Sequence, residues 1–466
     1  MQLKKYDTII IGGGISGLTS ALLAAKRGQK TAVLEQGATL SPVMHGFDRK
    51  GVHFETGFHY ASSLGKGEVG EFIFEFLGLD INPVPCMSDG YDEIHLKPTG
   101  RVFKMAYGRD KLEANLNAAF PEEKEAIKKY LDLVKENIEK SAFLNLHKGG
   151  DLDFHRIIDA GESLQQVLDR TFKSAEIKAV LAASTFLHGT PPSKIAFAQH
   201  CCVAGGLYDS VWEIEGGGLA VLEAYKKALT KAGVDVYLNT EAVKIEAAGD
   251  KKIITSKKEE RFECDICIST VHPKVFFKIA PPEVYREGYK NRVKDIQETP
   301  GFFTIYAVTK EGVNFNKKNV FILNDLDIDR VFENKDHDSE YYINFSSTNP
   351  QAVSIISLTD PDAEFWDKKA PGYSAKKQEF YDFVIQNIRR IAPEIHENIE
   401  YAGASTPATM QRYAGYYSGY GLMHDVNKTK ILPLTKIKGL YVSGQSVVAP
   451  GLLGAIITAL LMDKLI

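Results

Sequence analysis

The beginning of the chain alternates between short apolar runs and one helical pattern. Thr8 to Ile11 is an unbroken run rich in β-branched residues, which is typical of a buried strand in a parallel sheet. Small and apolar residues then dominate from Ile15 to Lys26, and Gly28 follows as a typical helix-ending residue. A second buried run, Thr31 to Leu34, delivers Glu35 at its end. The pattern predicts a strand–helix–strand unit.

Glycines connect the first strand to the helix in the order Gly12-x-Gly14-x-x-Gly17. In such a unit Gly12 permits a tight turn, Gly14 lets the backbone approach a pyrophosphate, and Gly17 lets helix and strand pack closely. The helix N-terminus then offers free N–H groups to phosphates. Glu35 would accept hydrogen bonds from a ribose diol, and its charge disfavours a 2′-phosphate. We predict a dinucleotide site; the alternative is a plain βαβ crossover whose glycines only shape a turn. The position at the start of the chain favours FAD over NAD.

The rest of the chain alternates in blocks. The pattern is mainly helical between residues 110 and 202, which predicts a cap. Aromatic and β-branched runs recur from Thr299 to about Leu358, which predicts an antiparallel sheet. Gly216-Gly217-Gly218 opens a second helix–strand unit of nucleotide-domain type, and Gly439 to Ile466 reads as strand, loop and helix. The predicted fold class is therefore α/β: a discontinuous Rossmann-like FAD-binding domain, an antiparallel-sheet substrate domain and a helical cap. The expected FAD-binding segments are 1–80, 206–280 and 426–466, with the cap at 81–205 and the sheet domain at 281–425.

Composition narrows the class of partner. The 466 residues carry a net charge of −4, with a pI near 6.3, which gives no electrostatic reason to expect nucleic acid. The five cysteines form no disulfide or zinc framework, and Cys264-x-x-Cys267 lies within what reads as one strand. Leu440 to Met462 has no charge, but glycines and a proline interrupt it, which argues against a membrane span. No secretory signal is expected. We predict a cytoplasmic protein without a metal, and leave a peripheral membrane contact open.

Several longer motifs resemble the flavoprotein family of phytoene desaturases, carotenoid isomerases and retinol saturases. FETGFHYASSLGKGE, from Phe54, is similar to the retinol-saturase pattern of an acid, Thr-Gly, an apolar residue and His-Tyr. STPATMQRYAGYYSGYG, from Ser405, matches the family's Thr-Pro element. GLYVSGQSVVAPGLLGAIITALL, from Gly439, resembles the family's C-terminal flavin motif in its Gly-Gln form. The resemblance runs along nearly the whole chain, is closest to the retinol-saturase-like branch, and implies FAD and a lipophilic substrate.

The resemblance also implies where the cofactor would lie. Val243 would lie against the adenine, and Gly444 and Gln445 beside the ribityl chain or the pyrophosphate. The helix beginning near Gly454 would direct its N-terminus at the flavin pyrimidine edge. The full set of expected cofactor residues is Gly12, Gly14, Ile15, Ser16, Gly17, Glu35, Gln36, Val243, Gly444, Gln445, Gly451, Leu453 and Gly454.

The loop after the ribose acid departs from the family pattern. Relatives carry a Gly-Gly pair just after the proline, whereas here Pro42 is followed by Val43-Met44-His45. We expect this loop to cover the cofactor differently, with His45 either entering the site or lying near solvent.

Flavin chemistry leaves the protein to orient the substrate, exclude water and place a proton donor. His59, Tyr60 and Tyr413 are the predicted catalytic residues because they belong to the family-like motifs, although each also reads as an ordinary packed residue. Further donor candidates are His188, His200 and Tyr208.

The leading hypothesis is an FAD-dependent oxidoreductase acting on C=C bonds of a long polyene (a retinoid, a carotenoid or an unsaturated fatty acid) in the saturase direction. The alternatives are a desaturase or cis–trans isomerase of the same fold, and a non-catalytic flavin- and lipid-binding protein. The aromatic stripe between residues 299 and 358 fits either a tunnel lining or an ordinary sheet core. No second complete glycine–acid unit is visible, so the electron donor or acceptor stays open.

Overall fold

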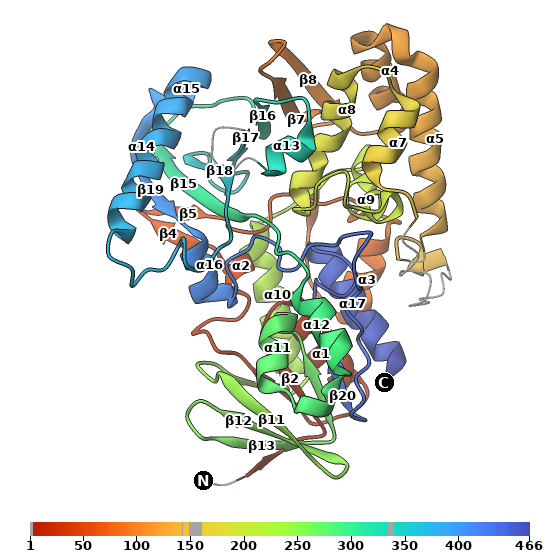
Figure 1. Cartoon of the computed structure of the whole chain (residues 1–466), viewed down its shortest axis with the longest axis vertical. Helices are drawn as coiled ribbons and strands as arrows, with labels where there is room; N and C mark the ends of the chain where they lie inside the picture. Colours follow the sequence, from red (N-terminus) through yellow and green to blue (C-terminus); the bar gives the residue numbers. More distant parts are fainter. Residues whose placement is uncertain (1–2, 142, 149–160, 334–339) are drawn as a thin grey trace.

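The computed structural model describes residues 3–141, 143–148, 161–333 and 340–466. In Figure 1 the nucleotide-binding part lies below, a large sheet at the upper left and a helical cap at the upper right. The lower part combines the red N-terminal, green middle and blue C-terminal segments, so the predicted discontinuous arrangement is present.

A five-stranded parallel sheet forms the centre of the lower part, in the order β10–β3–β2–β14–β20. Because every strand is parallel, the residues that follow the strands gather at one edge of the sheet, where such folds bind ligands. Gly12, Glu35, Thr270 and Ser443 occupy those positions. The strands are β2 (Thr8–Ile11), β3 (Thr31–Leu34), β10 (Asp235–Tyr237), β14 (Ile266–Ser269) and β20 (Leu440–Val442).

Layers of different kinds cover the two faces of this sheet. Ile10, Val33 and Ile268 pack in a core with the helices of one face. Those helices are α1 (Ile15–Lys26), α3 (Val69–Leu77), α10 (Gly217–Lys231) and α17 (Leu452–Leu465). The alternate residues, such as Ile9 and Cys267, pack against a small sheet and two helices. These are β1 (Lys4–Lys5), β11 (Ala242–Ala248), β12 (Lys251–Ser256), β13 (Arg261–Cys264), α11 (Pro273–Ile279) and α12 (Glu287–Lys294).

The upper-left part is a seven-stranded sheet in the order β19–β15–β18–β17–β16–β7–β8. It is mixed rather than purely antiparallel, because β16 runs parallel to β7. Two of its strands come from residues 89–106, within the segment that the sequence pattern assigns to the cap. The strands are β7 (Asp89–Leu96), β8 (Arg101–Ala106), β15 (Gly301–Thr309), β16 (Asn319–Leu323), β17 (Glu340–Phe345), β18 (Ala352–Thr359) and β19 (Ile399–Ser405).

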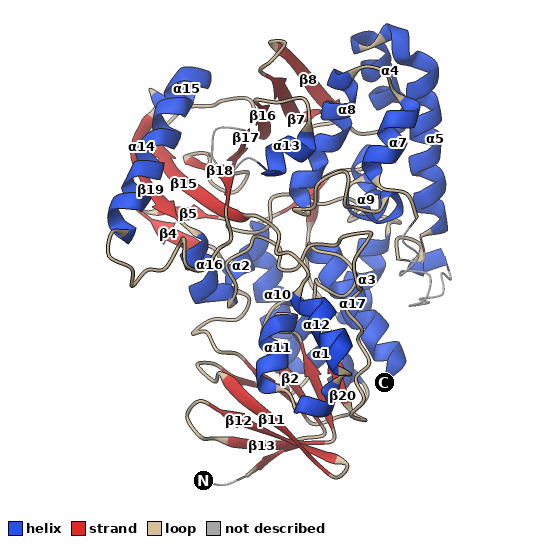
Figure 2. Cartoon of the chain, viewed as in Figure 1, coloured by secondary structure: helices blue, strands red, loops and turns tan. Residues whose placement is uncertain are grey.

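The large sheet uses its two faces differently. Phe303, Ile305 and Ile355 pack in one core with Val384 and Ile388 of α14 (Tyr373–Ile391), which lies on the outer side of the sheet in Figure 2. Phe321 and Leu358 point the other way and share a core with the cap. The cap helices are α4 (Arg109–Ala119), α5 (Lys124–Lys140), α7 (Leu164–Thr171), α8 (Ala175–Ala182) and α9 (Phe197–Val203).

Shorter elements connect these parts. They are α2 (Pro42–His45), β4 (Phe47–Arg49), β5 (Val52–Phe54), β6 (Pro83–Pro85), β9 (Trp212–Ile214), α13 (Ile328–Glu333), α15 (Pro393–His396) and α16 (Pro407–Ala414).

The reading of Cys264 and Cys267 as parts of one strand is wrong. Cys264 ends β13 and Cys267 lies in β14, and these strands belong to different sheets. Both thiols are free and fully buried.

The apolar segment from residue 440 to 462 divides as predicted into a strand, a loop and a helix. Among the described residues, no helix combines the length and apolarity needed to cross a membrane.

Candidate functional site

A cavity of about 1910 Å³ lies where the three parts meet. Pockets for single small ligands are typically about 300–1,000 Å³, so this cavity has room for a dinucleotide and a second ligand. Of the predicted site residues, all except Gly17 line it: Gly12, Gly14, Ile15, Ser16, Glu35, Gln36, His59, Tyr60, Val243, Tyr413, Gly444, Gln445, Gly451, Leu453 and Gly454.

The first glycine motif separates into a binding part and a packing part. A Cβ on Gly14 would meet no atom within 4 Å, so the backbone there borders open space at the start of α1. A Cβ on Gly17 would instead overlap the carbonyl oxygen of Gly12. Gly17 therefore brings helix and strand together, while Gly14 and the free N–H groups of α1 face the cavity, as phosphate binding requires.

Glu35 is buried at the end of β3, with its side chain held by backbone amides. Gly13 N–H donates to Oε2 at 2.7 Å, and Gly37 N–H donates to Oε1 at 2.6 Å. Burial raises the pKa of Glu35, and these two donors oppose that rise. The carboxylate is thus fixed at the rim of the glycine turn, where it can accept hydrogen bonds from a ribose.

The C-terminal segment supplies a second helix N-terminus. α17 begins at Leu452, two residues before the predicted Gly454, and Gly451, Leu452 and Leu453 line the cavity. A Cβ on Gly454 would overlap the carbonyl oxygen of Ala449, so the glycine lets the preceding loop pack onto the helix. A positive helix end beside the cavity suits an anionic group such as a reduced flavin ring.

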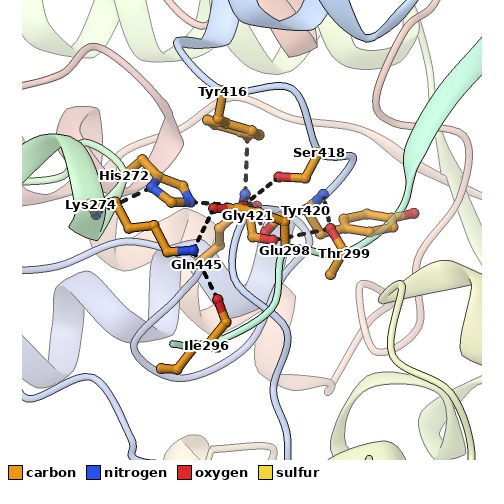
Figure 3. A network of polar contacts seen from close by, with 10 residues as sticks. All are labelled: His272, Lys274, Ile296, Glu298, Thr299, Tyr416, Ser418, Tyr420, Gly421 and Gln445. Atoms are coloured by element: carbon orange, nitrogen blue, oxygen red, sulfur yellow. Dashed lines mark hydrogen bonds and ion pairs between the residues drawn. The ribbon is translucent and has the colours of Figure 1, made fainter. Parts of the chain in front are cut away.

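Gln445 is fixed by the loop that faces it, as Figure 3 shows. Its side-chain amide donates to the hydroxyl of Tyr416 at 3.1 Å and to the carbonyl of Tyr420 at 2.9 Å. His424 Nε2 lies 3.0 Å from the Gln445 carbonyl, and Gln199 of α9 donates to His424 Nδ1 at 2.8 Å. These contacts connect the flavin-motif loop to the cap.

A polar network that the sequence analysis missed adjoins Gln445 (Figure 3). Glu298 Oε2 accepts from His272 at 3.1 Å and from Ser418 at 2.9 Å, and Lys274 lies 3.3 Å from Oε1. Burial alone would raise the pKa of Glu298, but these partners outweigh it and lower the pKa. His272 lines the cavity and packs against Tyr416, with ring centroids 5.5 Å apart. His272 follows the parallel strand β14, and residues at this end of such strands often bind ligands, so its place in the sequence could have indicated a site residue.

Val243 and Gln36 lie toward the nucleotide end. Val243, in β11, has 39% of its surface exposed at the cavity wall. Gln36 follows Glu35, and its side chain lies beside Gly415. A Cβ added to Gly415 would be 3.1 Å from the side-chain nitrogen of Gln36.

The unusual segment Val43-Met44-His45 forms the one-turn helix α2 instead of the predicted loop. Ser41 precedes it with a φ of 39°, and Thr56 donates to the carbonyl of Val43 at 2.9 Å. His45 lines the cavity, with Nδ1 3.0 Å from the carbonyl of Gly46. The segment is therefore clamped to the residues before His59 and closes one side of the cavity.

The second glycine run, Gly216-Gly217-Gly218, allows close packing and does not form a binding site for phosphates. A Cβ on Gly217 would overlap the buried carboxyl of Glu55, and one on Gly218 would lie 2.7 Å from the Met44 carbonyl. Glu55 also contacts Ser346 at 3.3 Å, and burial raises its pKa to about 7. This run lets α10 pack onto α2 and the hairpin, and it does not line the cavity.

The aromatic stripe turns out to serve both functions that the pattern left open. Alternate residues fill the core under α14, while the others face the cavity. Phe302 and Tyr342 line the floor, and Phe186 of the cap stacks on Phe321 at 6.1 Å. Further floor residues are Thr304, Tyr306, Ile356 and Leu358, with Leu187 and Leu207 opposite on the cap side. The residues that line this part of the cavity are mostly apolar and aromatic.

The predicted proton donors differ in their surroundings. His59 lines the cavity, burial lowers its pKa to about 4, and its Nδ1 has no partner among the described residues. Tyr60 donates from its hydroxyl to Oδ2 of the buried Asp92 at 2.8 Å. Tyr413 is 51% exposed, which places it at the cavity rim, where solvent competes for its hydroxyl. His188, His200 and Tyr208 are buried and do not line the cavity.

Cations gather on the exposed side of the cavity. Lys377 lies near Lys368 and Arg49, and burial together with these like charges lowers its pKa. Burial and Arg412 lower the pKa of Lys368 in the same way. This side of the cavity is therefore electropositive and favours the approach of anionic groups.

Comparisons with known proteins agree with this geometry. The family model described as flavin containing amine oxidoreductase matches residues 15–461. All-trans-retinol 13,14-reductase of Rattus norvegicus is 25% identical over 99% of this chain and 86% of its own length. The chloroplastic prolycopene isomerase of Daucus carota is 22% identical over 95% of this chain and 77% of its own.

The fold has solved counterparts. The structure of putrescine oxidase bound to putrescine superimposes with a TM-score of 0.66 at 15% identity, covering 100% of this chain and 98% of that one. The glycine turn, the acid held by backbone amides and the open helix N-termini fit a dinucleotide. The chain belongs to the family of flavin-containing amine oxidoreductases, and FAD is its cofactor.

Proposed function

We propose that this protein is an FAD-dependent reductase that saturates a carbon–carbon double bond of a long, lipophilic polyene such as a retinoid, a carotenoid or an unsaturated fatty acid. The observation that carries the proposal is the aromatic extension of the cavity. Phe302 and Tyr342 provide an aromatic floor beyond the expected cofactor end, and Phe186 and Leu207 cover it from the cap. A rigid conjugated chain gains from such a surface because its burial is driven by apolar area.

In this proposal, different residues around the cavity would bind the cofactor, orient the substrate and exclude water. Bound FAD supplies hydride exchange at N5 of its isoalloxazine ring. The N-terminus of α1 and Gly14 would hold the phosphates, and Glu35, fixed by the Gly13 amide, would hold the ribose. The sheet floor would orient the polyene and the cap would keep water from it, and Tyr60, whose hydroxyl is hydrogen-bonded to Asp92, lines the same cavity.

The names of the relatives support the direction of the reaction. The rat relative is a retinol reductase, which favours saturation, and the carrot relative is an isomerase, which keeps cis–trans isomerisation as the second candidate. The apolar floor fits a polyene in either reaction. Saturation and isomerisation therefore have to be distinguished by whether the double bond of the product gains hydrogen.

Product mass tests the proposal. Purified, FAD-loaded protein is reduced with dithionite without oxygen and incubated with all-trans-retinol, a carotenoid or a conjugated fatty acid. A gain of two hydrogens supports a reductase. An unchanged mass with altered chromatographic retention supports an isomerase, and a loss of two hydrogens by the oxidised protein supports a desaturase. Tight binding without any conversion would replace the proposal with a lipid-binding role.

We also propose a cytoplasmic location with at most a peripheral membrane contact. All five cysteines are free thiols, as is usual for proteins of a reducing compartment. Cell fractionation followed by a high-salt wash tests this, since protein that stays with membranes after the wash would contradict it.

A further inference from the structure

Tyr60 and Asp92 form a buried pair at the wall of the cavity. The Tyr60 side chain lines the cavity, whereas Asp92, in β7, is only 4% exposed and lies behind it. The hydroxyl donates to Oδ2 of Asp92 at 2.8 Å, and Oδ1 makes no hydrogen bond of normal length among the described residues. The side chain of Asn319 is the other polar group close enough to favour the charged form of Asp92. An unsatisfied buried carboxyl oxygen is costly, which indicates a functional reason for the acid.

The groups around Asp92 do not neutralise its charge. Its register partner on β16 is Asn319, whose amide donates to the carbonyl of Tyr91 at 3.1 Å. Burial raises the pKa of Asp92 to about 7, against the weaker opposing effect of Tyr60 and Asn319. The titratable groups that face it are Tyr60, Tyr91, Tyr342 and Cys86. Cys86 in turn lies near Lys318 and Glu213, which form an ion pair at 3.2 Å.

We propose that Asp92 is the proton reservoir for double-bond reduction, recharging Tyr60 each time the tyrosine hydroxyl gives its proton to a substrate carbon. The inference rests on the proposed function. It makes Tyr60 the catalytic acid and Asp92 a positioning and proton-supplying residue that acts through it.

Reduction of one C=C bond needs one hydride and one proton. Reduction adds a hydride from reduced flavin to one carbon and a proton to its neighbour. The π pair of the double bond forms the second C–H bond with the Tyr60 proton, while the Tyr60 oxygen takes the proton of the Asp92 carboxyl. A solvent proton then returns to Asp92 by way of the Tyr60 hydroxyl, which separates Asp92 from the cavity. The hydride would come from bound FAD in its reduced form, which would end oxidised.

The direction of one hydrogen bond explains why the acid must be able to titrate. When Asp92 is ionised, Tyr60 donates to it, and its proton points away from the cavity. When Asp92 is protonated, the carboxyl donates to the Tyr60 oxygen, and the phenolic proton is free to point at the substrate. Protonation of Asp92 therefore switches Tyr60 into its donating state.

His59 is less suited to this task, although it precedes Tyr60. Burial holds its pKa at about 4, so at neutral pH the ring is uncharged and carries no spare proton.

The test compares pH profiles of single-turnover reduction in wild type, Asp92→Asn and Tyr60→Phe. The wild-type rate should fall as pH rises through about 7. Asp92→Asn should lose this fall and react about 100-fold more slowly, the usual size of a general-acid contribution, while the polyene concentration that gives half the maximal single-turnover rate stays within about twofold. Tyr60→Phe should behave in the same way.

Tyr342→Phe is the control for the shape of the pH profile, and its absolute rate is not compared because Tyr342 also lines the substrate floor. Its hydroxyl also reaches from the cavity wall to a buried polar partner, Asn319 at 2.8 Å, but that partner does not titrate. Tyr342→Phe should keep the pH-dependent fall. Retention of the fall in Asp92→Asn, or an unchanged rate in Tyr60→Phe, would overturn the proposal.

A second readout separates this inference from the proposed function. Infrared difference spectra of the resting, FAD-loaded protein between acidic and alkaline pH should contain a protonated carboxyl band that Asp92→Asn lacks. If the band is present and no polyene is reduced, the proposed function fails while the titration of Asp92 stands. If polyenes are reduced and the band is identical in Asp92→Asn, the proton reservoir is refuted and the function stands.

Discussion

The α-carbon of Gly17 lies so close to the carbonyl oxygen of Gly12 that any Cβ on Gly17 would overlap that oxygen. Three residues earlier, a Cβ on Gly14 would meet nothing within 4 Å. The glycines of one motif therefore have separable roles. Gly17 allows the fold to form, and Gly14 leaves room for the cofactor, so substitutions at the two positions should fail in different ways.

Gly14→Val should give a folded protein without FAD. The added side chain points into the cavity, and the φ of −75° at this position suits any residue. We expect an apoprotein melting temperature close to that of wild-type apoprotein, and flavin absorbance near zero after purification. Yellow, fully loaded Gly14→Val protein would refute the placement of the pyrophosphate.

Gly17→Ala should destabilise the protein itself. Alanine gains about 1 kcal/mol in helix propensity over glycine, but overlap with a backbone oxygen costs about 1–3 kcal/mol or more in a packed interior. The net loss should lower the melting temperature of the apoprotein by several degrees. Gly14→Ala is the control, since it adds the same methyl group in open space, and equal stability of the two variants would contradict the packing role.

His59→Phe should keep FAD and slow turnover without changing the shape of the pH profile. Because burial lowers the pKa of His59 to about 4, the ring stays neutral across the neutral range and no titration is removed there. The ratio of variant to wild-type rate should stay constant between about pH 6 and 8. A ratio that changes with pH in this window would mean that His59 itself titrates during the reaction.

Asp92→Asn should stabilise the protein increasingly as the pH rises. The folded-state pKa of Asp92, about 7, lies above its ordinary value of 3.8. Between these values the folded state binds the proton more tightly than the unfolded state, so the free energy of unfolding of wild type falls as pH increases. The difference corresponds to at most about 4 kcal/mol.

Chemical denaturation at about pH 4.5 and pH 8 measures this effect. The free energy of unfolding of Asp92→Asn minus that of wild type should be larger at about pH 8 than at about pH 4.5. Glu55, whose pKa is also raised to about 7, does not affect this difference because both proteins contain it. An advantage that is independent of pH would show that Asp92 has an ordinary pKa.

Local patterns were enough to predict the nucleotide-binding unit. The strand from Thr8, the helix from Ile15 and the strand from Thr31 have the predicted bounds, because buried β-branched runs and glycine punctuation act over a few residues. The aromatic runs after Thr299 likewise predicted four strands of the large sheet, β15, β16, β17 and β18.

Features that depend on distant pairing were not predictable. Strand β7 pairs with β16, more than 200 residues later, so nothing near Asp92 shows that its carboxyl is buried. The break between Cys264 and Cys267 was hidden for the same reason, since two consecutive strands join different sheets. The role of Gly217 became visible only with Glu55 against it.

The most direct test is a single turnover without oxygen. Protein carrying one equivalent of dithionite-reduced FAD is mixed with an excess of all-trans polyene, and flavin reoxidation at its visible absorbance is followed together with product mass. If the protein is a polyene reductase, we expect one polyene molecule to gain two hydrogens for each flavin that is reoxidised. Flavin that stays reduced, or that reoxidises with no mass gain in the polyene, would contradict it.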